Sequence, residues 1–537
     1  MKKWIKQITE GMILSATTCY MFFIYAPLEL LFTNQDEFFF DSYILLPVLL
    51  VIFFATFIPS VMVFAFLRKK SERIYTISLG LYFVAFLCSY IQGNFLVKGL
   101  PPLDGTWIDW GAYPLERLKC IGVWCTVSLI VFAGYKKIGL DLFQKSIKVI
   151  SSCMGLMLLV TLITLGATNH GFERKTILNT TTKNLFTMSS NQNFIILVLD
   201  AVDARAFSEI VKSDSKYSEI FEDFTAYDNT VGAYPFTKSS IPYILTGVWY
   251  ENEEAFEDYE RRAFAQSSLF ESLEAEGYRM GLYETELLLD EIGGRRFDNI
   301  VTCKHGVNSY ITFARWQIQM AGFKYAPFDL KRICFVNPAA FNTLKLSPNG
   351  EEQFTENNAV FYGKITDEEI ELTQDKCFKF IHIEGGHVPF QYDEDVNIIE
   401  NGTYEDNLKA CLTITGAYFD KLRESGVYDN SAIIVMADHG YENSMRSNPI
   451  LYVKGVGEKH ELVVSDAPIS YEDLQGAYAK LLQGAQKDAV FPYREGDVRE
   501  RRFIWHSQAD FMEEYVQKGH ATDMDTLEKT GRTYCLK

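Results

Sequence analysis

"NFIILVLD", residues 193–200, is a short apolar run that ends in an acidic residue. It is rich in Ile, Leu and Val and contains no alternating polar positions, which predicts a strand buried on both faces of a sheet. Four more runs of this kind follow along the chain, at residues 279–285, 378–387, 432–440 and 449–455.

Segments with apolar residues at helical spacing separate these runs. Examples are residues 265–278 (AQSSLFESLEAEGY) and 404–426 (YEDNLKACLTITGAYFDKLRESG). Buried strands that alternate with amphipathic helices predict an α/β domain with a central, mostly parallel sheet. In such a sheet the functional site lies beyond the carboxyl ends of the strands.

The N-terminal third has a different pattern, because five long apolar runs follow one another there. Most of them approach or exceed the ~20 residues that cross the hydrocarbon core of a bilayer. We therefore predict a five-helix transmembrane domain over residues 1–167, a polar juxtamembrane linker over 168–192 and an extracellular α/β domain over 193–537. The predicted spans are approximately residues 12–32, 43–67, 74–97, 121–135 and 147–165.

Short loops between the apolar runs set the expected orientation in the membrane. The N-terminal MKKWIKQ and the loops at 68–73 and 135–148 are basic, whereas the loop at 33–41 has no Lys or Arg. The positive-inside rule places the basic segments in the cytoplasm. After five crossings of the cell membrane, the α/β domain is expected on the extracellular or periplasmic side.

Charge also divides the chain after the apolar third. Residues 1–167 contain 14 Lys and Arg against 10 Asp and Glu, and the remainder contains 37 against 59. An acidic distal domain argues against nucleic acid as a partner, since binding phosphates takes Lys and Arg. The ten cysteines show no CxxC or Cys/His metal spacing. We interpret most of them as small apolar residues and leave one or two disulfides open.

Acidic residues and histidines lie at the ends of three predicted strands. Asp200 ends the first strand, His382 and His387 belong to the third, and Asp438 and His439 end the fourth. Taken alone, an Asp after a strand is more often a helix cap or turn residue. Together at one sheet edge, these side chains predict a site for one divalent metal ion, and carboxylate and imidazole ligands suit Mn, Zn or Mg.

A hydroxyl-rich stretch, AYPFTKSSIPYILTG at residues 233–247, follows the first strand. Thr237, Ser239 and Ser240 open a predicted helix, where a Thr or Ser would act as the N-cap in any protein. The alternative is that one hydroxyl is a nucleophile, which would need a cation or a base to activate it.

These elements, in this order, resemble the alkaline-phosphatase-like enzymes of the sulfatase fold. Within that fold the chain is similar to membrane-anchored phospho-transferases such as lipoteichoic acid synthases and lipid A phosphoethanolamine transferases. The lipoteichoic acid synthases share its layout of a five-span anchor and an external catalytic domain. The resemblance covers about residues 193–460 and rests on ILVLDAVDAR (196–205), TKSSIPYILTG (237–247), HIEGGHVPF (382–390), ADHG (437–440) and RSNPILYVKG (446–455).

The resemblance implies roles for the matching residues. Asp200, Thr237, Asp438 and His439 would bind the metal ion. Thr237 would also be the nucleophile, because TKSSIP matches the transferase pattern Thr-x-x-Ser-x-Pro. His387 would bind the phosphoryl group or assist the leaving group.

His382 and Arg446 are additional candidates for binding an anionic substrate.

The sequence departs from the family pattern at two places. Sulfatases of this fold use a Cys/Ser-x-Pro-x-Arg motif that is matured to formylglycine, and no such motif occurs around Thr237. Sulfate-ester hydrolysis is therefore disfavoured. Tyr471 stands where relatives often carry His, so one phosphate or metal contact of the relatives is expected to be missing.

The resulting hypothesis is a metal-dependent membrane transferase. It would move phosphoglycerol or phosphoethanolamine from a phospholipid donor to a cell-envelope glycan, lipid or polymer through a phospho-threonine intermediate. One alternative is a phosphodiesterase or phosphatase that passes the same group to water. Another is a receptor or scaffold that has lost activity. This alternative predicts that one or more metal ligands are replaced, but all the expected ligand types are present.

Overall fold

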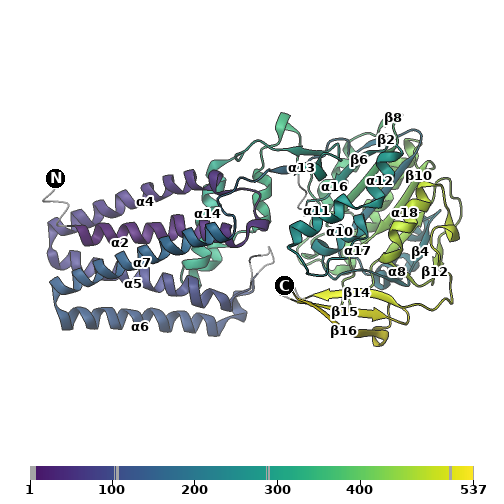
Figure 1. Ribbon diagram of the computed structural model, residues 1–537. Coiled ribbons are helices and arrows are strands. Elements are labelled where there is room, and N and C mark those ends of the chain that lie inside the picture. Colours follow the sequence, from purple (N-terminus) through teal and green to yellow (C-terminus); the bar gives the residue numbers. More distant parts are fainter. Residues whose placement is uncertain are drawn as a thin grey trace. The chain divides into compact units, whose positions relative to one another are not determined.

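The computed structural model describes residues 8–101, 103, 108–285, 287, 291–506 and 511–535. The chain forms two compact units (Figure 1). The first comprises residues 1–177 and 303–346, and the second comprises residues 178–302 and 347–537.

Five helical segments of the first unit are long and apolar enough to cross a membrane, which confirms the prediction of five spans. Side-chain caps explain where two of them begin, since Asp41 and Ser71 accept hydrogen bonds from the first amides of α4 and α5. The segments are Thr9–Thr33, with α2 (Thr9–Tyr20), η1 (Met21–Tyr25) and α3 (Ala26–Thr33), then α4 (Ser42–Lys70), Glu72–Gly99 with α5 (Glu72–Ile91), α6 (Pro114–Ile138) and α7 (Leu140–Thr168).

Residues 303–346 also belong to the first unit, which departs from the expected boundary that put them in the α/β domain. The main helix of this segment is α14 (Tyr310–Tyr325), followed by α15 (Phe328–Lys331). Phe313, Met320 and Tyr325 of α14 are buried in the core of the helical unit. This apolar face explains why the segment packs with the membrane helices.

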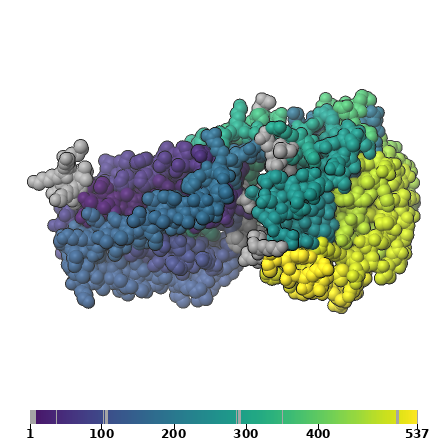
Figure 2. Space-filling model, viewed as in Figure 1, coloured from purple at the N-terminus to yellow at the C-terminus, as the bar shows by residue number. Residues whose placement is uncertain are grey.

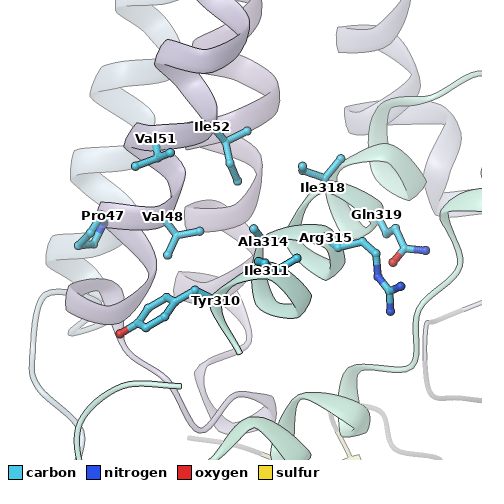
Figure 3. A pocket seen from close by; sticks show the side chains of 10 residues that line it. All are labelled: Pro47, Val48, Val51, Ile52, Tyr310, Ile311, Ala314, Arg315, Ile318 and Gln319. Carbon is cyan, nitrogen blue, oxygen red and sulfur yellow. The ribbon is translucent and has the colours of Figure 1, made fainter. Parts of the chain in front are cut away.

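An apolar groove of about 840 Å³ lies between α14 and the beginning of α4 (Figure 3). Its walls are mainly aliphatic, and Arg315 and Gln319 add polar groups from α14. The lining residues are Pro47, Val48, Val51 and Ile52 of α4, and Tyr310, Ile311, Ala314, Arg315, Ile318 and Gln319 of α14.

The second unit is built on a seven-stranded sheet with the strand order β12-β4-β11-β10-β3-β9-β6. The four strands from β10 to β6 are parallel, and every residue of β3, β9 and β10 is buried, as expected for a sheet covered on both faces. The mostly parallel sheet and all five predicted strands are confirmed. The bounds are β3 (Asn193–Leu199), β4 (Thr225–Tyr227), β6 (Arg279–Tyr283), β9 (Cys377–Ile383), β10 (Ser431–Met436), β11 (Leu451–Lys454) and β12 (Val463–Ser465).

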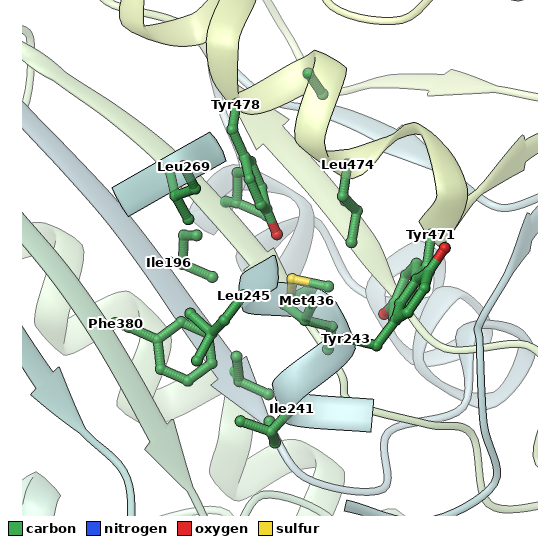
Figure 4. Close-up of a cluster of buried hydrophobic side chains, with 14 of the residues drawn as sticks. Ile196, Ile241, Tyr243, Leu245, Leu269, Phe380, Met436, Tyr471, Leu474 and Tyr478 are labelled. Carbon is green, nitrogen blue, oxygen red and sulfur yellow. The ribbon is translucent and has the colours of Figure 1, made fainter. Parts of the chain in front are cut away.

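Helices cover both faces of this sheet. Figure 4 shows the core on one face, where Ile241 and Leu245 of α10 lie near Ile196, Phe380 and Met436 of the strands. Full burial of each aliphatic side chain contributes roughly 1.5–3 kcal/mol. One face carries α10 (Thr237–Thr246), α12 (Ser268–Ala275) and α18 (Leu474–Leu482), and the other carries α8 (Ala204–Ser213), α16 (Asn358–Asp367) and α17 (Tyr404–Glu424).

Smaller sheets complete the second unit. The segment expected to be only a linker contains β1 (Leu178–Thr180) and β2 (Thr187–Ser189), because these strands pair with β7 (Ile300–Thr302) and β8 (Glu371–Thr373). The sequence analysis did not identify the C-terminal antiparallel sheet, which lies at the surface of the unit (Figure 2, yellow). It consists of β14 (Arg501–His506), β15 (Phe511–Gln517) and β16 (Leu527–Cys535).

The ten cysteines are all free thiols. Six of them are buried, which agrees with their interpretation as small apolar residues.

A tight glycine turn follows β9 and touches the end of β3. Gly385 has a φ of +56°, and a Cβ there would lie 2.4 Å from the backbone nitrogen of Asp200. The next residue, Gly386, donates its N–H to the Asp200 carbonyl at 2.8 Å. Since the atoms in the way are backbone atoms, no side-chain movement can make room.

We expect Gly385→Ala to lower the free energy of unfolding by about 2 kcal/mol or more, through both the clash and the strained φ. Thermal unfolding of the full chain in detergent would measure this as a lower Tm. Gly363→Ala in α16 is the matched control. A Cβ there meets nothing within 4 Å, and the helix should gain about 0.5–1 kcal/mol. Equal Tm values for the two variants would contradict the steric argument.

Candidate functional site

The carboxyl edge of the parallel strands brings together polar residues that are far apart in the sequence. Asp200 directly follows β3, Asp438 comes two residues after the end of β10, and His382 is the penultimate residue of β9. The strands are in register here, because Val198 pairs with both Met436 and His382. Neighbouring parallel strands therefore deliver these side chains to one edge.

Asp200, Asp438 and His439 form a group that could hold a metal ion, with one ligand atom from each residue within 4.8 Å of the others. The Nε2 atom of His439 lies 3.3 Å from Asp438 Oδ2 and 3.6 Å from Asp200 Oδ1. Asp438 and His439 are at most 1% exposed, and Asp200 is 9% exposed. The structure thus brings three of the four predicted ligands together in a site shielded from water.

The hydrogen bond of His439 decides which ring nitrogen faces the carboxylates. Nδ1 lies 2.7 Å from the Gly440 carbonyl oxygen, and since a carbonyl only accepts, Nδ1 carries the proton. Burial lowers the pKa of His439, and the nearby Asp438 carboxylate opposes this only in part. With Nδ1 as the donor to Gly440, Nε2 is the ring nitrogen that faces the two carboxylates, and a cation between them would stabilise this arrangement.

Asp438 is charged although it is completely buried. Burial alone would raise its pKa, but the neighbouring His439 and His382, the Ala201 N–H and the Thr237 hydroxyl outweigh burial and lower the pKa. Oδ1 accepts the Ala201 N–H at 3.0 Å, whereas Oδ2 is buried without a hydrogen-bond partner. A buried carboxylate oxygen that lacks a donor fits a metal ligand, so the residues present suit a divalent cation.

Thr237 is the first residue of α10, and its hydroxyl lies close enough to Asp438 to help lower the pKa of that carboxyl. The N-cap predicted from the hydroxyl-rich stretch is not formed. Phe236 occupies the cap position, and Thr237 already has helical geometry, so its side chain does not cap the first turn. The hydroxyls of Ser239 and Ser240 donate to backbone carbonyls. The first turn of α10 thus has no side-chain cap, and such a helix N-terminus favours an anion.

Phe236 is surrounded by side chains that could meet an anionic substrate. The guanidinium of Arg446 lies 5.1 Å from its ring centre, and the ring centres of His506 and His439 lie 5.1 and 6.4 Å away. Arg446 has a φ of +55°, which is rare for an L-residue and is typical of functional sites. The structure thus places Arg446 beside the N-terminus of α10.

His387 lies just beyond the glycine turn that contacts Asp200. Its Nδ1 is 2.6 Å from the Val388 carbonyl oxygen, so this nitrogen is the donor and Nε2 is the ring atom that can meet a substrate. The side chain is partly exposed. His387 is therefore accessible from solvent at the same edge of the sheet.

Tyr471 is fully buried, and its hydroxyl donates to the carbonyl of Ala437, the residue before Asp438. The residue at this position therefore holds the ligand segment in place through the backbone. It does not face a substrate.

Three residues at this edge were not predicted from the sequence. Glu284 directly follows β6, which is the same signal that singled out Asp200. Glu356 precedes α16 in a loop, and His506 ends β14, so neither lies in a recognisable motif. His382 lies near the two glutamates with a side chain that is only 1% exposed. This burial argues against the substrate-binding role considered for it from the sequence.

Comparison with known proteins assigns residues 192–463 to the model of the sulfatase family. Similar solved structures include the lipoteichoic acid synthase LtaP from Listeria monocytogenes, at 12% identity over 67% of this chain and 90% of that chain (TM-score 0.36). A protein in the alkaline phosphatase superfamily from Vibrio parahaemolyticus is 14% identical over 67% and 81% (TM-score 0.35). The PsFucS1 sulfatase from Pseudoalteromonas sp. is 13% identical over 64% and 84% (TM-score 0.39). The chain matches no curated protein sequence.

Asp438→Asn tests the metal group, because asparagine keeps the size of the side chain and the acceptor for the Ala201 N–H but removes the charge. We expect affinity for a divalent cation to fall at least about tenfold. Inductively coupled plasma mass spectrometry after dialysis would measure it. Asp420→Asn on the exposed side of α17 is the control. A wild-type metal content in Asp438→Asn would refute the assignment.

His506 predicts a pH dependence of stability. Burial lowers its pKa to about 4, whereas an unfolded imidazole titrates near 6.5. Between these values only the unfolded state gains a proton, so stability is fully present above pH 6.5 and falls toward pH 4, by at most about 1.4 kcal/mol per unit.

His506→Gln, which can still bond Ser239, should reduce the slope of Tm against pH in this window. The control is His170→Gln, at a histidine whose side chain is 77% exposed. Identical slopes for wild type and His506→Gln would show that the burial of this ring is not maintained in solution.

Proposed function

The chain belongs to the sulfatase family, whose members are enzymes of the alkaline phosphatase superfamily, and on this premise we propose that it transfers a phosphorylated alcohol group. The donor is a membrane phospholipid, the transferred group is phosphoglycerol or phosphoethanolamine, and the acceptor is a cell-envelope glycan, lipid or polymer. One observation carries the proposal. A threonine hydroxyl at the first residue of α10 lies beside Asp438, and no Cys/Ser-x-Pro-x-Arg motif occurs around it.

Asp200, Asp438, His439 and Thr237 are the residues that would hold the metal ion. A Mn, Zn or Mg ion bound there supplies a Lewis acid that polarises a phosphoryl oxygen and lowers the pKa of the threonine hydroxyl. The chain itself contributes the N-terminus of α10 and the guanidinium of Arg446, which favour a phosphoryl group beside Thr237.

Two displacements at phosphorus follow from this arrangement. Before the first, the Thr237 hydroxyl loses its proton to solvent. Its Oγ alkoxide then bonds to the donor phosphorus, and the bond from phosphorus to the lipid alcohol oxygen breaks. Protonated His387 gives its Nε2 proton to that oxygen. In the second, the acceptor oxygen bonds to phosphorus, the Thr237 ester bond breaks, and His387 takes the acceptor proton. The cycle returns both residues to their starting forms.

A lipid donor is supported by features of the first unit alone. Five helices are apolar enough to span a membrane, and the groove between α14 and α4 has the aliphatic lining that an acyl chain requires. Arg315 adds a positive charge to that lining. With the orientation predicted from the basic loops, this end of α4 lies at the outer leaflet.

Thr237→Ala tests the nucleophile. We expect turnover of phosphatidylglycerol or phosphatidylethanolamine in detergent micelles to fall at least about a thousandfold, while Thr237→Ser retains part of it. Ser218→Ala, which removes an exposed hydroxyl from α9 (Ser215–Ile220), is the control. Intact-protein mass spectrometry of the trapped wild type should show the transferred group on Thr237. Turnover unchanged by Thr237→Ala would reject this nucleophile.

Acceptor dependence separates the transferase from a hydrolase. Donor turnover is measured with and without membrane-glycan acceptors, and the modified acceptor is quantified. A transferase releases donor faster with acceptor and accumulates the modified product. Release that is indifferent to acceptor, with no modified product, would assign the chain to the phosphodiesterases or phosphatases.

A further inference from the structure

Residues 303–346, which return to the membrane unit between β7 and α16, have the opposite charge from the rest of the chain. The whole chain contains 51 Lys and Arg against 69 Asp and Glu, but this segment is basic. Its helices are α14, α15 and the short η6 (Arg332–Cys334), which we call the inserted helices. The basic residues of the segment are Lys304, Arg315, Lys324, Lys331, Arg332 and Lys345, and the acidic residue is Asp329.

Contacts fix the inserted helices at one end of the membrane bundle. Lys324 pairs with Glu29, four residues before α3 ends, and Asp329 pairs with Arg117, the fourth residue of α6, at 2.8 Å. The groove joins α14 to the beginning of α4. The ends of helices that cross a membrane lie at the level of the lipid headgroups. The inserted helices therefore lie at that level too.

Large apolar side chains of the inserted helices face outward. Ile311 is 86% exposed, and Ile318, Leu330 and Ile333 are each at least 44% exposed. Val51 of α4, which lines the groove together with Ile311 and Ile318, is 70% exposed. The apolar surface of the inserted helices is thus continuous with that of a helix long and apolar enough to span the membrane. An exposed apolar surface of this kind marks a site of contact with a membrane or a protein.

Two arginines of the inserted helices complement a lipid surface in charge. Arg315 and Arg332 are exposed, and neither forms an ion pair with another of the described residues. Asp329, in contrast, already pairs with Arg117 of α6. The exposed charge that remains is positive, which suits the phosphates of anionic lipids. This charge extends beyond the groove, because Arg332 is not among the groove-lining residues.

The side chains of α14 point in directions that fit a helix lying in the headgroup region. In Figure 3 the side chain of Ile318 extends in the direction in which α4 runs from Val48 to Ile52, and the guanidinium of Arg315 extends the opposite way. Since α4 begins at this end of the bundle, Ile318 is directed toward the hydrocarbon and Arg315 toward water. Arginines at a membrane interface adopt this arrangement, with an apolar stem and a charged tip among the phosphates.

We propose that the inserted helices lie in the headgroup region of the membrane, on the side where α4 begins, and bind anionic phospholipids. Arg315 and Arg332 contact the lipid phosphates, and Ile311, Ile318 and Ile333 enter the hydrocarbon between acyl chains. The α/β sequence thereby contributes a membrane contact of its own, in addition to the five spans. This inference does not depend on which group the enzyme transfers.

Photo-cross-linking tests where the inserted helices lie. The full chain, with p-benzoylphenylalanine in place of Ile311 or Ile333, is reconstituted in nanodiscs of phosphatidylcholine and phosphatidylserine and irradiated. Intact-protein mass spectrometry then counts the lipid adducts. Val51 is the positive control, and Val498, which is 91% exposed in the second unit, controls for exposure alone.

We expect both inserted positions to form lipid adducts with a yield close to that at Val51 and well above that at Val498. Yields no higher than at Val498 would overturn the proposal. Cross-links to a second copy of the chain in place of lipid would overturn it as well, because they would assign this surface to a dimer.

Lipid affinity tests the two arginines. Phosphatidylserine is anionic and is not a proposed donor, so its binding is independent of the transfer reaction. Native mass spectrometry of the full chain in detergent measures its affinity, with zwitterionic phosphatidylcholine as the reference. We expect the wild type to prefer phosphatidylserine, and Arg315→Gln and Arg332→Gln each to lower this affinity about fivefold.

Arg261→Gln is the matched control, at an exposed arginine of α11 (Phe256–Ala265), and should leave the affinity unchanged. Equal affinity of the wild type for the two lipids would overturn the proposal. An unchanged affinity for phosphatidylserine in the double variant, with both Arg315→Gln and Arg332→Gln, would overturn it too.

Discussion

The charged carboxylate of Asp438, held inside the protein at the end of β10, is the constraint on which the rest of the site depends. It is completely buried, and its only ion-pair partner among the described residues is His439, a ring whose pKa burial lowers. An isolated buried charge costs several kcal/mol, so the surroundings must compensate. The Ala201 N–H and the Thr237 hydroxyl do so in part. The remaining oxygen, Oδ2, is suited to bind a cation. The fold that buries this carboxylate therefore also creates the candidate metal site.

The glycine turn after β9 fixes the position of Asp200, on the other side of the site from Asp438. Gly385 brings the chain against the backbone of Asp200, and only a residue without a Cβ permits this approach; Gly386 then donates its N–H to the Asp200 carbonyl. Asp200 is consequently fixed through its own backbone, and its two carboxylate oxygens face different imidazoles, those of His439 and His382. Strand register places His382 on the far side of it. The Asp200 carboxylate therefore lies between these two imidazoles.

The chain does not simply run from a membrane anchor into an enzyme domain. The chain passes from one unit to the other three times, since residues 303–346 return to the membrane unit between β7 and α16. The returning helix α14 is held there by a buried apolar face and forms one wall of the aliphatic groove. An enzyme that takes its donor from a bilayer needs such a surface for the apolar part of the substrate. In the proposed reaction, the insertion would let the membrane unit bind the apolar part of the donor as well as attach the enzyme to the membrane.

The sequence by itself determined the five apolar spans, the buried parallel strands and the acidic or imidazole residues at their ends. These features depend on composition and short-range periodicity, which local physics controls. It also singled out Thr237, because a hydroxyl, a helix start and a neighbouring proline lie within one short stretch. Only the tertiary structure decided that Phe236 is the N-cap, that residues 303–346 leave the α/β unit, and that His506 approaches α10 from the C-terminal sheet. Only the tertiary structure places Glu356 at the sheet edge, because no sequence motif contains this residue. These outcomes depend on which distant segments pack together, and long-range packing leaves no periodic signal in the chain.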